Sequence, residues 1–377
     1  MRLKFADIFA GCGGLSYGFA TNDFYKGILA ADSWEMARQT YSYNHPSIPF
    51  EKLDMYDNSH ISAAIKMLKG QCDILIGGPP CQGFSTLGKR EEDCKKSRLV
   101  DTFLKIALSV KPKIIVMENV KGLLSKKHDS GVLYPQFVTN SLEQGRTKYY
   151  VHQGLINSLE YGIAQTRTRY ILIAVRSDVQ RSQDLLHNIV QILSSSRTEA
   201  YKTVQDAIGD LPEVGAEGGN QEITVTRSSE MITIFNHESM KHSLVLQKRL
   251  QHVPPGGGLL DVPKRLLTPH LKKMVDGAYG SGGHVKNIYG RLEWDKPCGT
   301  IVAGMDKITC GRYVHPVENR LLTPRECARI QSYPDSFRFF GSLVSQYYLV
   351  GNSVPPKISE VIANAINKAI CLGQESL

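Results

Sequence analysis

Short apolar runs alternate with amphipathic stretches along the first half of the chain, and this alternation predicts an α/β fold. The apolar runs have the length of strands and occupy residues 3–9, 27–31, 74–76, 113–117, 149–156 and 170–175. Several intervening stretches have helical spacing, at residues 15–21, 35–43, 61–68 and 99–110. Strands and helices that alternate in this way build a sheet with helices on both faces.

The second half of the chain has a different pattern. From residue 177 to about residue 319 it is irregular and rich in glycine, proline and turn-forming residues. An apolar helix predicted over residues 358–370 has a face suited to packing against the first part of the chain. We therefore expect a main domain of residues 1–178, completed by residues 341–377, and a smaller irregular domain of residues 179–340.

Composition adds a basic charge to this picture. The formal net charge is +9, which suits a polyanionic partner but also occurs in proteins that have none. Part of the excess lies in one stretch of the second domain, at Lys241, Lys248, Arg249, Lys264, Arg265, Lys272, Lys273, Lys286 and Arg291. Only Asp261 and Asp276 oppose them there. A solvated basic surface and a DNA-binding surface both fit this pattern.

The cysteines indicate the compartment. All eight lie outside any Cys-x-x-Cys pair, so the spacing signals neither a zinc site nor a redox dithiol. We expect free thiols, no metal, and a cytoplasmic protein. No stretch is long and apolar enough to span a bilayer, so we expect no membrane contact. We also expect a monomer.

The strongest candidate for chemistry is Cys81. It follows the apolar run 74–76 in the sequence Gly-Gly-Pro-Pro-Cys-Gln-Gly-Phe-Ser. Ligands of open α/β sheets bind beyond the carboxyl ends of the strands. Pro79 and Pro80 stiffen the loop, which suits a nucleophile that must be held in one place. An isolated buried cysteine more often only packs, but a filler side chain needs no rigid loop.

Two further strands end in polar groups that suit a nucleotide cofactor. The first runs into Asp-Ile-Phe-Ala-Gly-Cys-Gly-Gly at residues 7–14, where glycines let the backbone approach a ligand. The second ends at Asp32, placed to accept hydrogen bonds from ribose hydroxyls. Trp34 could lie against a base or in the core. Asp54 could meet an adenine amino group or cap a helix or turn.

A carboxylate and two arginines follow. Glu118 comes at the end of the apolar run 113–117, where glutamate is a poor strand former, so this position suggests a functional role. Arg167 and Arg169 alternate, so in an extended segment they share one face. An exposed basic edge would explain the arginines equally well. Thr323, Pro324 and Glu326 form a helix-capping box.

Pro79-Pro80-Cys81-Gln82, Glu118-Asn119-Val120 and Gln165-x-Arg-x-Arg, in this order after the glycine turn, resemble the motifs of the cytosine-C5 DNA methyltransferases of bacterial restriction-modification systems. The resemblance runs over nearly the whole chain. It implies a Rossmann-like, S-adenosylmethionine-dependent methyltransferase fold with a DNA-recognition domain. It implies the catalytic residues Cys81, Glu118, Arg167 and Arg169. It implies that the cofactor contacts Phe9, Gly11, Cys12, Gly13, Gly14, Asp32, Ser33, Trp34, Asp54, Met55, Pro80, Leu99, Asn352 and Ser353.

The resemblance also implies a mechanism. Cys81 as thiolate adds to C6 of a cytosine flipped out of double-stranded DNA, and Glu118 holds the exocyclic amine and N3. C5 then takes the methyl group, and loss of its proton expels Cys81. Arg167 would steady the base. A cognate restriction endonuclease acting separately would be a functional partner.

Three alternatives stay open on the residues. One is a tRNA cytosine-C5 methyltransferase on the same scaffold, against which the long basic second domain argues. Another is a catalytically silent DNA-binding regulator, against which the presence of both Cys81 and Glu118 argues. A nicotinamide dehydrogenase is disfavoured because Ser16 replaces the third glycine of the dinucleotide fingerprint.

Overall fold

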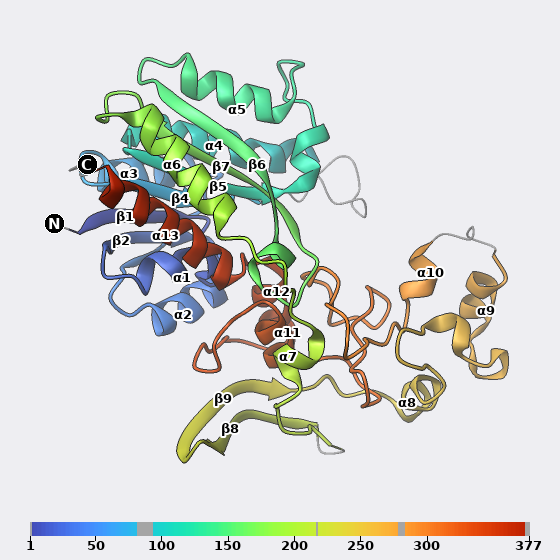
Figure 1. Ribbon diagram of the computed structural model, residues 1–377. Helices are drawn as coiled ribbons and strands as arrows, with labels where there is room; N and C mark the ends of the chain where they lie inside the picture. Colours follow the sequence, from blue (N-terminus) through green and yellow to red (C-terminus); the bar gives the residue numbers. More distant parts are fainter. Residues whose placement is uncertain (1, 81–92, 216–217, 278–282, 374–377) are drawn as a thin grey trace. The chain divides into compact units, whose positions relative to one another are not determined.

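The computed structural model describes residues 2–80, 93–215, 218–277 and 283–373. The chain forms two compact units (Figure 1). Unit 1 comprises Met1–Tyr161, Thr168–Glu199 and Ser353–Leu377, and unit 2 comprises Gly162–Arg167 and Ala200–Asn352. These bounds differ from the expected ones mainly at residues 179–199, which fold with unit 1, and at residues 341–352, which fold with unit 2.

Unit 1 is built on a mixed seven-stranded sheet in the order β3-β2-β1-β4-β5-β7-β6. Its strands are β1 (Leu3–Ile8), β2 (Tyr25–Asp32), β3 (Phe50–Lys52), β4 (Ile74–Gly77), β5 (Ile114–Val120), β6 (Tyr149–Asn157) and β7 (Thr168–Arg176). β7 runs antiparallel to β5 and β6, and the other neighbours are parallel. From β1 the chain builds outward to β2 and β3, then crosses back to β4 and β5. The β1–β4 boundary is therefore the topological switch point, where ligands of such sheets bind.

Helices cover both faces of this sheet (Figure 1). They are α1 (Gly14–Ala20), α2 (Glu35–Asn44), α3 (Asn58–Leu68), α4 (Asp93–Val110), η2 (Lys121–Ser125), α5 (Tyr134–Glu143), η3 (Ser158–Tyr161), α6 (Ser182–Ser195) and α13 (Pro356–Leu372). On one face α13 packs between α1 and α6; on the other α4 contacts α3 and α5. The expected fold class, a Rossmann-like mixed sheet with helices on both faces, is confirmed.

The main core of unit 1 lies between the sheet and the α3–α4–α5 layer. It includes Ile61, Ala64 and Leu68, which recur at intervals of three and four residues along α3 and so face inward together. Asp57 caps this helix by accepting a hydrogen bond from the Ser59 amide. Periodicity and cap together explain why the helix begins and faces as it does.

α6 was not foreseen, although its sequence carries a helical signal. Leu185, Leu186, Ile189 and Leu193 are buried and follow helical spacing. The helix packs on β6, β7 and α13, so it belongs to unit 1 although it follows residue 177. The irregular stretch begins only after it.

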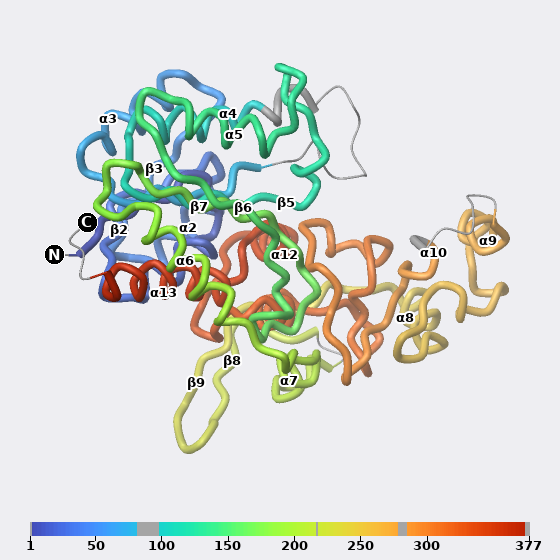
Figure 2. Tube along the Cα trace, turned by 45° about the horizontal axis from the view of Figure 1, so that its top comes forward, coloured from blue at the N-terminus to red at the C-terminus, as the bar shows by residue number. Residues whose placement is uncertain are grey.

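Unit 2 contains a β-hairpin and several short helices. Its elements are α7 (Val204–Ile208), β8 (Gly219–Arg227), β9 (Glu230–Glu238), α8 (Leu244–Leu250), η4 (Leu259–Asp261), η5 (Lys264–Leu266), α9 (Pro269–Val275), α10 (Gly283–Asn287), α11 (Pro324–Ile330) and α12 (Leu343–Asn352). The Cα trace shows β8 and β9 as a long projecting hairpin (Figure 2). A small apolar core, which includes Leu250, Leu259 and Val314, joins the segment from α8 to residue 314.

The predicted capping box of α11 is confirmed. Thr323 accepts a hydrogen bond from the Glu326 amide, and the Glu326 carboxylate accepts one from the Thr323 amide. Pro324 occupies the first helical position.

Among the described residues, no helix is both long and apolar enough to cross a bilayer.

Candidate active site

The candidate active site of unit 1 lies at the carboxyl ends of β2, β1, β4 and β5, which are successive parallel neighbours in the sheet. β1 and β4 approach closely where they end. A Cβ on Gly77 would lie only 2.4 Å from the Ile8 carbonyl oxygen, so a larger residue would push these strands apart. The segments that leave the four strands therefore start from adjacent points.

The glycine turn after β1 has the backbone shape of a ligand loop. Phe9 has a φ of 67°, and the Phe9 and Ala10 amides both donate to the Ala31 carbonyl of β2. Gly11 has a φ of 53° with open space around its missing Cβ, whereas a Cβ on Gly13 would lie 2.6 Å from Nε2 of His45. One glycine thus faces free space and the other is packed against the protein. Gly14 then begins α1, and Cys12 is buried between them.

Asp32, the last residue of β2, accepts two backbone hydrogen bonds in the site. Its Oδ2 accepts from the Gly11 amide at 3.0 Å, and its Oδ1 accepts from the Trp34 amide at 3.0 Å. Burial raises the pKa of Asp32, and these amides oppose the rise. A carboxylate offers about four acceptor sites, more than the backbone amides around Asp32 use. The side chain can therefore brace the glycine turn and still accept a hydroxyl.

The other expected cofactor residues from β2 to α4 divide into exposed and buried groups. Trp34 is 37% exposed at the start of α2, so its side chain is not a core residue, and Ser33 beside it is exposed. Asp54 is exposed, and its Oδ1 accepts from the Tyr56 amide at 2.9 Å, as in a turn. Met55 and Leu99 are buried in one apolar cluster, against which Phe9 packs.

β4 leads into the proline loop. Pro79 is buried and Pro80 is half-buried. The Pro79 carbonyl accepts a hydrogen bond of 3.1 Å from Nδ2 of Asn119. Cys81 lies outside the described residues, as does the charged stretch that follows it, so its role as nucleophile stays a prediction.

Glu118 lies within β5 and is paired with Arg169 of β7. Arg169 Nε is 3.2 Å from Glu118 Oε1, and the two side chains are 17% and 12% exposed. Desolvation lowers the pKa of Arg169, and the Glu118 carboxylate opposes that shift. A Cβ on Gly78 would lie 3.3 Å from Glu118 Oε2, so the second carboxylate oxygen faces the segment that leads to Cys81.

Arg167 has a different environment from Arg169. It precedes β7, is 2% exposed, and donates to the carbonyl oxygens of Ile301 at 2.8 Å and Gly351 at 3.4 Å, all within unit 2. The two arginines, which alternation would place on one face of an extended segment, have different partners, and the assigned strand begins only at Thr168. The residue beside Glu118 is Arg169.

Asn352 and Ser353, the last two expected cofactor contacts, belong to different units. Asn352 is exposed and ends α12 in unit 2, while Ser353 is buried and begins the last segment of unit 1. Helix α12 thus ends at Asn352, a few residues before the final helix, α13, begins.

Comparisons with known proteins decide the family. The sequence model described as "C-5 cytosine-specific DNA methylase" matches residues 3–368. The chain belongs to this family of DNA methylases. The Type II methyltransferase M.DdeI of Desulfomicrobium norvegicum is 31% identical over 386 residues, covering 97% of this chain and 88% of the relative. M1.HphI of Haemophilus parahaemolyticus is 32% identical over 373 residues, covering 98% of this chain and 87% of that relative.

A solved structure shares the fold of this DNA methylase. A prophage-encoded protein of E. coli, assigned as a DNA modification methyltransferase, superposes with a TM-score of 0.71 at 22% identity, covering 98% of this chain and all of the other. The family excludes the dehydrogenase interpretation. It also means that the motif resemblance seen in the sequence is confirmed.

The basic stretch of unit 2 separates into exposed and structural residues. Lys241, Lys248, Arg265, Lys272, Lys273 and Lys286 are exposed, as a nucleic-acid surface requires. Arg291 was counted with them, and this is wrong. It is 3% exposed and donates to the carbonyl oxygens of Leu250, Val253, His315 and Glu318 and to Oδ1 of Asn319.

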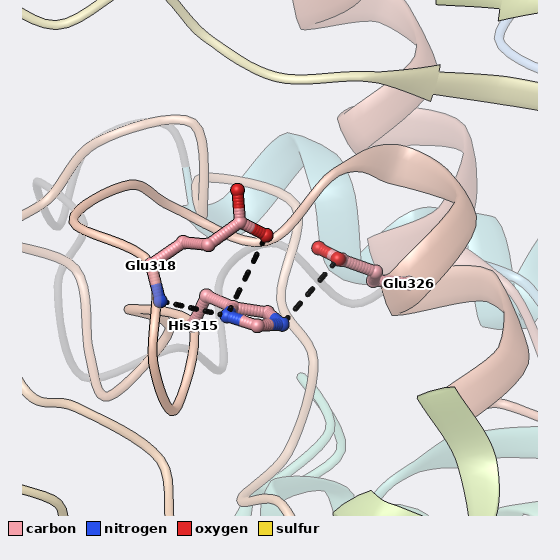
Figure 3. Close-up of side chains that lie close together, drawn as sticks. All are labelled: His315, Glu318 and Glu326. Carbon is pink, nitrogen blue, oxygen red and sulfur yellow. Dashed lines mark hydrogen bonds and ion pairs between the residues drawn. The ribbon is translucent and has the colours of Figure 1, made fainter. Parts of the chain in front are cut away.

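Three side chains of unit 2, His315, Glu318 and Glu326, lie close enough together to resemble a metal site (Figure 3). Each is already engaged. Arg320 binds Glu318 at 2.6 Å and Glu326 at 2.8 Å, and His315 Nδ1 accepts the Glu318 amide at 3.0 Å. The arginine supplies the positive charge that a cation would bring, so the cluster is an ion-pair network.

Two groups near the site were missed by the sequence analysis. Asn119 belongs to the Glu118-Asn119-Val120 motif, and the sequence alone does not predict its hydrogen bond to the Pro79 carbonyl. Asp7 is fully buried in β1 behind the glycine turn; Ser16 Oγ donates to its Oδ2 at 2.6 Å, and Tyr41 OH donates to Ser16 Oγ at 2.8 Å. A charged residue inside an apolar run was the available signal for Asp7.

Proposed function

We propose that this DNA methylase transfers a methyl group from S-adenosylmethionine to C5 of a cytosine in a specific double-stranded DNA sequence, through a covalent bond between Cys81 and C6. The observation that carries the proposal is the orientation of Glu118. Its Oε1 is held by Arg169, and its Oε2 faces Gly78, three residues before Cys81. A carboxylate held in this way can act on the same base as the thiol.

The carboxyl ends of β1 and β2 suit the cofactor. Gly11 leaves open space where a Cβ would lie, and Asp32 provides acceptors for ribose hydroxyls. Trp34 offers an accessible aromatic face for adenine, and Asp54 an accessible carboxylate for its amino group. S-adenosylmethionine, when bound, supplies an electrophilic methyl group. We assign Phe9, Met55, Pro80 and Leu99 to the apolar wall of this site.

The side chains of the protein make cytosine nucleophilic. The Cys81 thiolate adds to C6, which moves electron density toward C5. Glu118 accepts a hydrogen bond from the exocyclic amine and, in its protonated form, donates its proton to N3, so charge need not build up on the ring. After C5 has gained the methyl group, it loses its proton to a base, the C5–C6 double bond re-forms, and Cys81 leaves as thiolate. We assign Arg169, rather than Arg167, to orienting Glu118.

DNA has to present the cytosine outside the helix, because C6 is covered by stacking within a duplex. We propose that unit 2 supplies the target recognition. Its exposed lysines and arginine between residues 241 and 286 would contact phosphates, and loop side chains would read base edges. A cognate endonuclease would act separately on the unmodified sequence, as expected of a restriction-modification pair.

Replacement of the nucleophile tests the chemistry. We expect Cys81→Ala to abolish both methyl transfer and covalent trapping by duplex DNA that contains 5-fluorocytosine, while duplex binding survives. Cys371→Ala is the matched control, since this residue is exposed near the end of α13 and its thiol donates a hydrogen bond to Oδ1 of Asn367. Methyl transfer by the Cys81 variant at the wild-type rate would refute the covalent mechanism.

The substrate needs a separate experiment. Bisulfite sequencing of duplex DNA incubated with the enzyme would show which cytosine is modified and in which sequence. Parallel reactions with tRNA would separate the RNA alternative from the DNA one. Modification of tRNA with no modification of duplex DNA would overturn the proposed substrate.

A further inference from the structure

The proline loop before Cys81 offers few groups by which it can be held. Pro79 and Pro80 have no backbone N–H, so over these two residues the loop can be fixed only through carbonyl oxygens and packing. Pro79 is buried, and a buried carbonyl without a donor costs free energy. Within the described part of the chain, the recorded donor to this carbonyl is the Asn119 amide.

The orientation of the Asn119 side chain is fixed. Its Oδ1 accepts the Val120 amide at 2.9 Å, and its Nδ2 donates to the Pro79 carbonyl at 3.1 Å. Because one end faces a donor and the other an acceptor, the amide cannot be turned over without losing both bonds. Asn119 is 2% exposed, so water does not compete for these bonds.

The same residue is the immediate chain neighbour of Glu118. β5 pairs with β7 from Ile114 to Val120, so Glu118 and Asn119 both belong to a rigid strand. Successive residues of a strand point to opposite faces. Glu118 is therefore held by Arg169 on one side, while Asn119 holds the proline loop from the other.

We propose that Asn119 is a positioning residue for the methyl-transfer reaction: it fixes the segment that carries the nucleophile relative to the carboxylate. The inference rests on the proposed function. Its side chain touches neither base nor cofactor in this proposal, and it acts through the Pro79 carbonyl. Misplacement of a reacting group by about 1 Å can cost a factor of about 100 in rate, so one hydrogen bond at this point can matter.

The test uses Asn119→Ala and Asn119→Asp in the full chain. Aspartate has the same shape but sets a carboxylate oxygen against the Pro79 carbonyl. We expect both variants to lower kcat and the rate of trapping by 5-fluorocytosine duplex by roughly tenfold to 100-fold. The dissociation constants for S-adenosylmethionine and duplex should change less than about twofold.

Tyr149→Phe is the matched structural control. Tyr149 is 2% exposed, and its hydroxyl donates to the Pro112 carbonyl at 2.9 Å, so it also holds a proline carbonyl, but before β5 begins. We expect this variant to lose stability with an unchanged trapping rate. A trapping rate that falls equally in Tyr149→Phe, or stays at the wild-type value in both Asn119 variants, would overturn the inference.

A pH profile adds a readout that a loss of stability alone would not produce. A protonated aspartate can donate to the Pro79 carbonyl as Asn119 does, so the trapping rate of Asn119→Asp relative to wild type should recover as pH falls from about 8 to about 6. A ratio that does not change with pH would count against the hydrogen-bond role. If the wild-type enzyme itself is not trapped, the proposed function fails; if only the Asn119 variants behave as wild type, this inference alone fails.

Discussion

Arg169 reaches Glu118 diagonally across two antiparallel strands. In the register of β5 and β7, Glu118 lies opposite Ile171 and Arg169 lies opposite Val120, and Arg169 Nε still approaches Glu118 Oε1 to 3.2 Å. Both side chains are largely buried, so removing either charge would leave the other one buried without this partner, which is costly. The pair leaves Oε2 of Glu118 directed at the proline loop.

We expect Arg169→Gln to lower kcat by roughly tenfold to 100-fold, because Glu118 then loses the partner that fixes its orientation. Steady-state methylation of duplex DNA measures the effect. Arg176→Gln is the control: Arg176 lies at the other end of β7, where it pairs with exposed Asp178 and donates to the Lys111 carbonyl. Equal losses of kcat in the two variants would contradict the assignment.

Asp32 should govern cofactor affinity. Its two oxygens each accept a backbone amide, so in Asp32→Asn the new NH₂ group must oppose a donor whichever way it turns. We expect the dissociation constant for S-adenosylmethionine, measured by calorimetry, to rise about tenfold or more, equivalent to about 1.4 kcal/mol.

Asp73 provides the control for Asp32. It also accepts a backbone amide, from Lys4 at 2.9 Å, and binds Lys113 at 3.0 Å, but it lies just before β4 begins. Asp73→Asn therefore also sets an NH₂ group against a donor, but at the amino ends of the strands, opposite to the carboxyl ends where the candidate site lies. The assignment fails if this variant weakens cofactor binding as much as Asp32→Asn does.

The sequence predicted the sheet well because burial on both faces requires apolar runs, and those runs are visible. It placed the end of the fourth run at Met117, whereas β5 continues to Val120. The polar residues Glu118 and Asn119 break the apolar pattern, but their backbones still pair with Ile171 and Tyr170 of β7. Interstrand pairing of that kind is not encoded in local hydrophobicity.

The two arginines before and within β7 show a second limit. Alternation predicts a shared face only where the backbone is extended throughout. Just before Arg167 the backbone turns at Thr166, because the Arg167 amide donates to the Gln165 carbonyl two residues back. The environment of Arg167 is set by hydrogen bonds to carbonyls distant in the sequence, and the same is true of Arg291.

Arg291 should stabilise unit 2 without contributing to DNA affinity directly. Its guanidinium satisfies acceptors from four backbone carbonyls and one side chain, which a lysine ammonium cannot reproduce. We expect Arg291→Lys to lower the free energy of unfolding by about 3 kcal/mol, measured in urea. Arg265→Lys, at an exposed position of the same unit, should leave it unchanged. Similar values for the two variants would show that the buried network is not needed.

Asp7 should make stability fall as pH rises. Burial raises its pKa from 3.8 to about 8. Between these values the folded chain keeps the Asp7 proton and the unfolded chain releases it. The unfolded state thus binds fewer protons, so the free energy of unfolding falls with rising pH, by up to about 1.4 kcal/mol per pH unit from this group. Above about pH 8 both states are ionised and the decline ends.

Asp7→Asn separates this effect from the rest of the pH dependence. The amide oxygen can still accept from Ser16 Oγ, but the side chain no longer titrates. Because Asp7 Oδ1 has no hydrogen-bond partner among the described residues, the NH₂ group that replaces it is an unsatisfied donor, and this adds a cost of about 1–3 kcal/mol that does not itself depend on pH. The informative quantity is therefore the slope. Urea midpoints between about pH 5 and pH 8 should fall less steeply in the variant than in the wild type. Parallel curves would mean that Asp7 does not remain protonated in the folded enzyme.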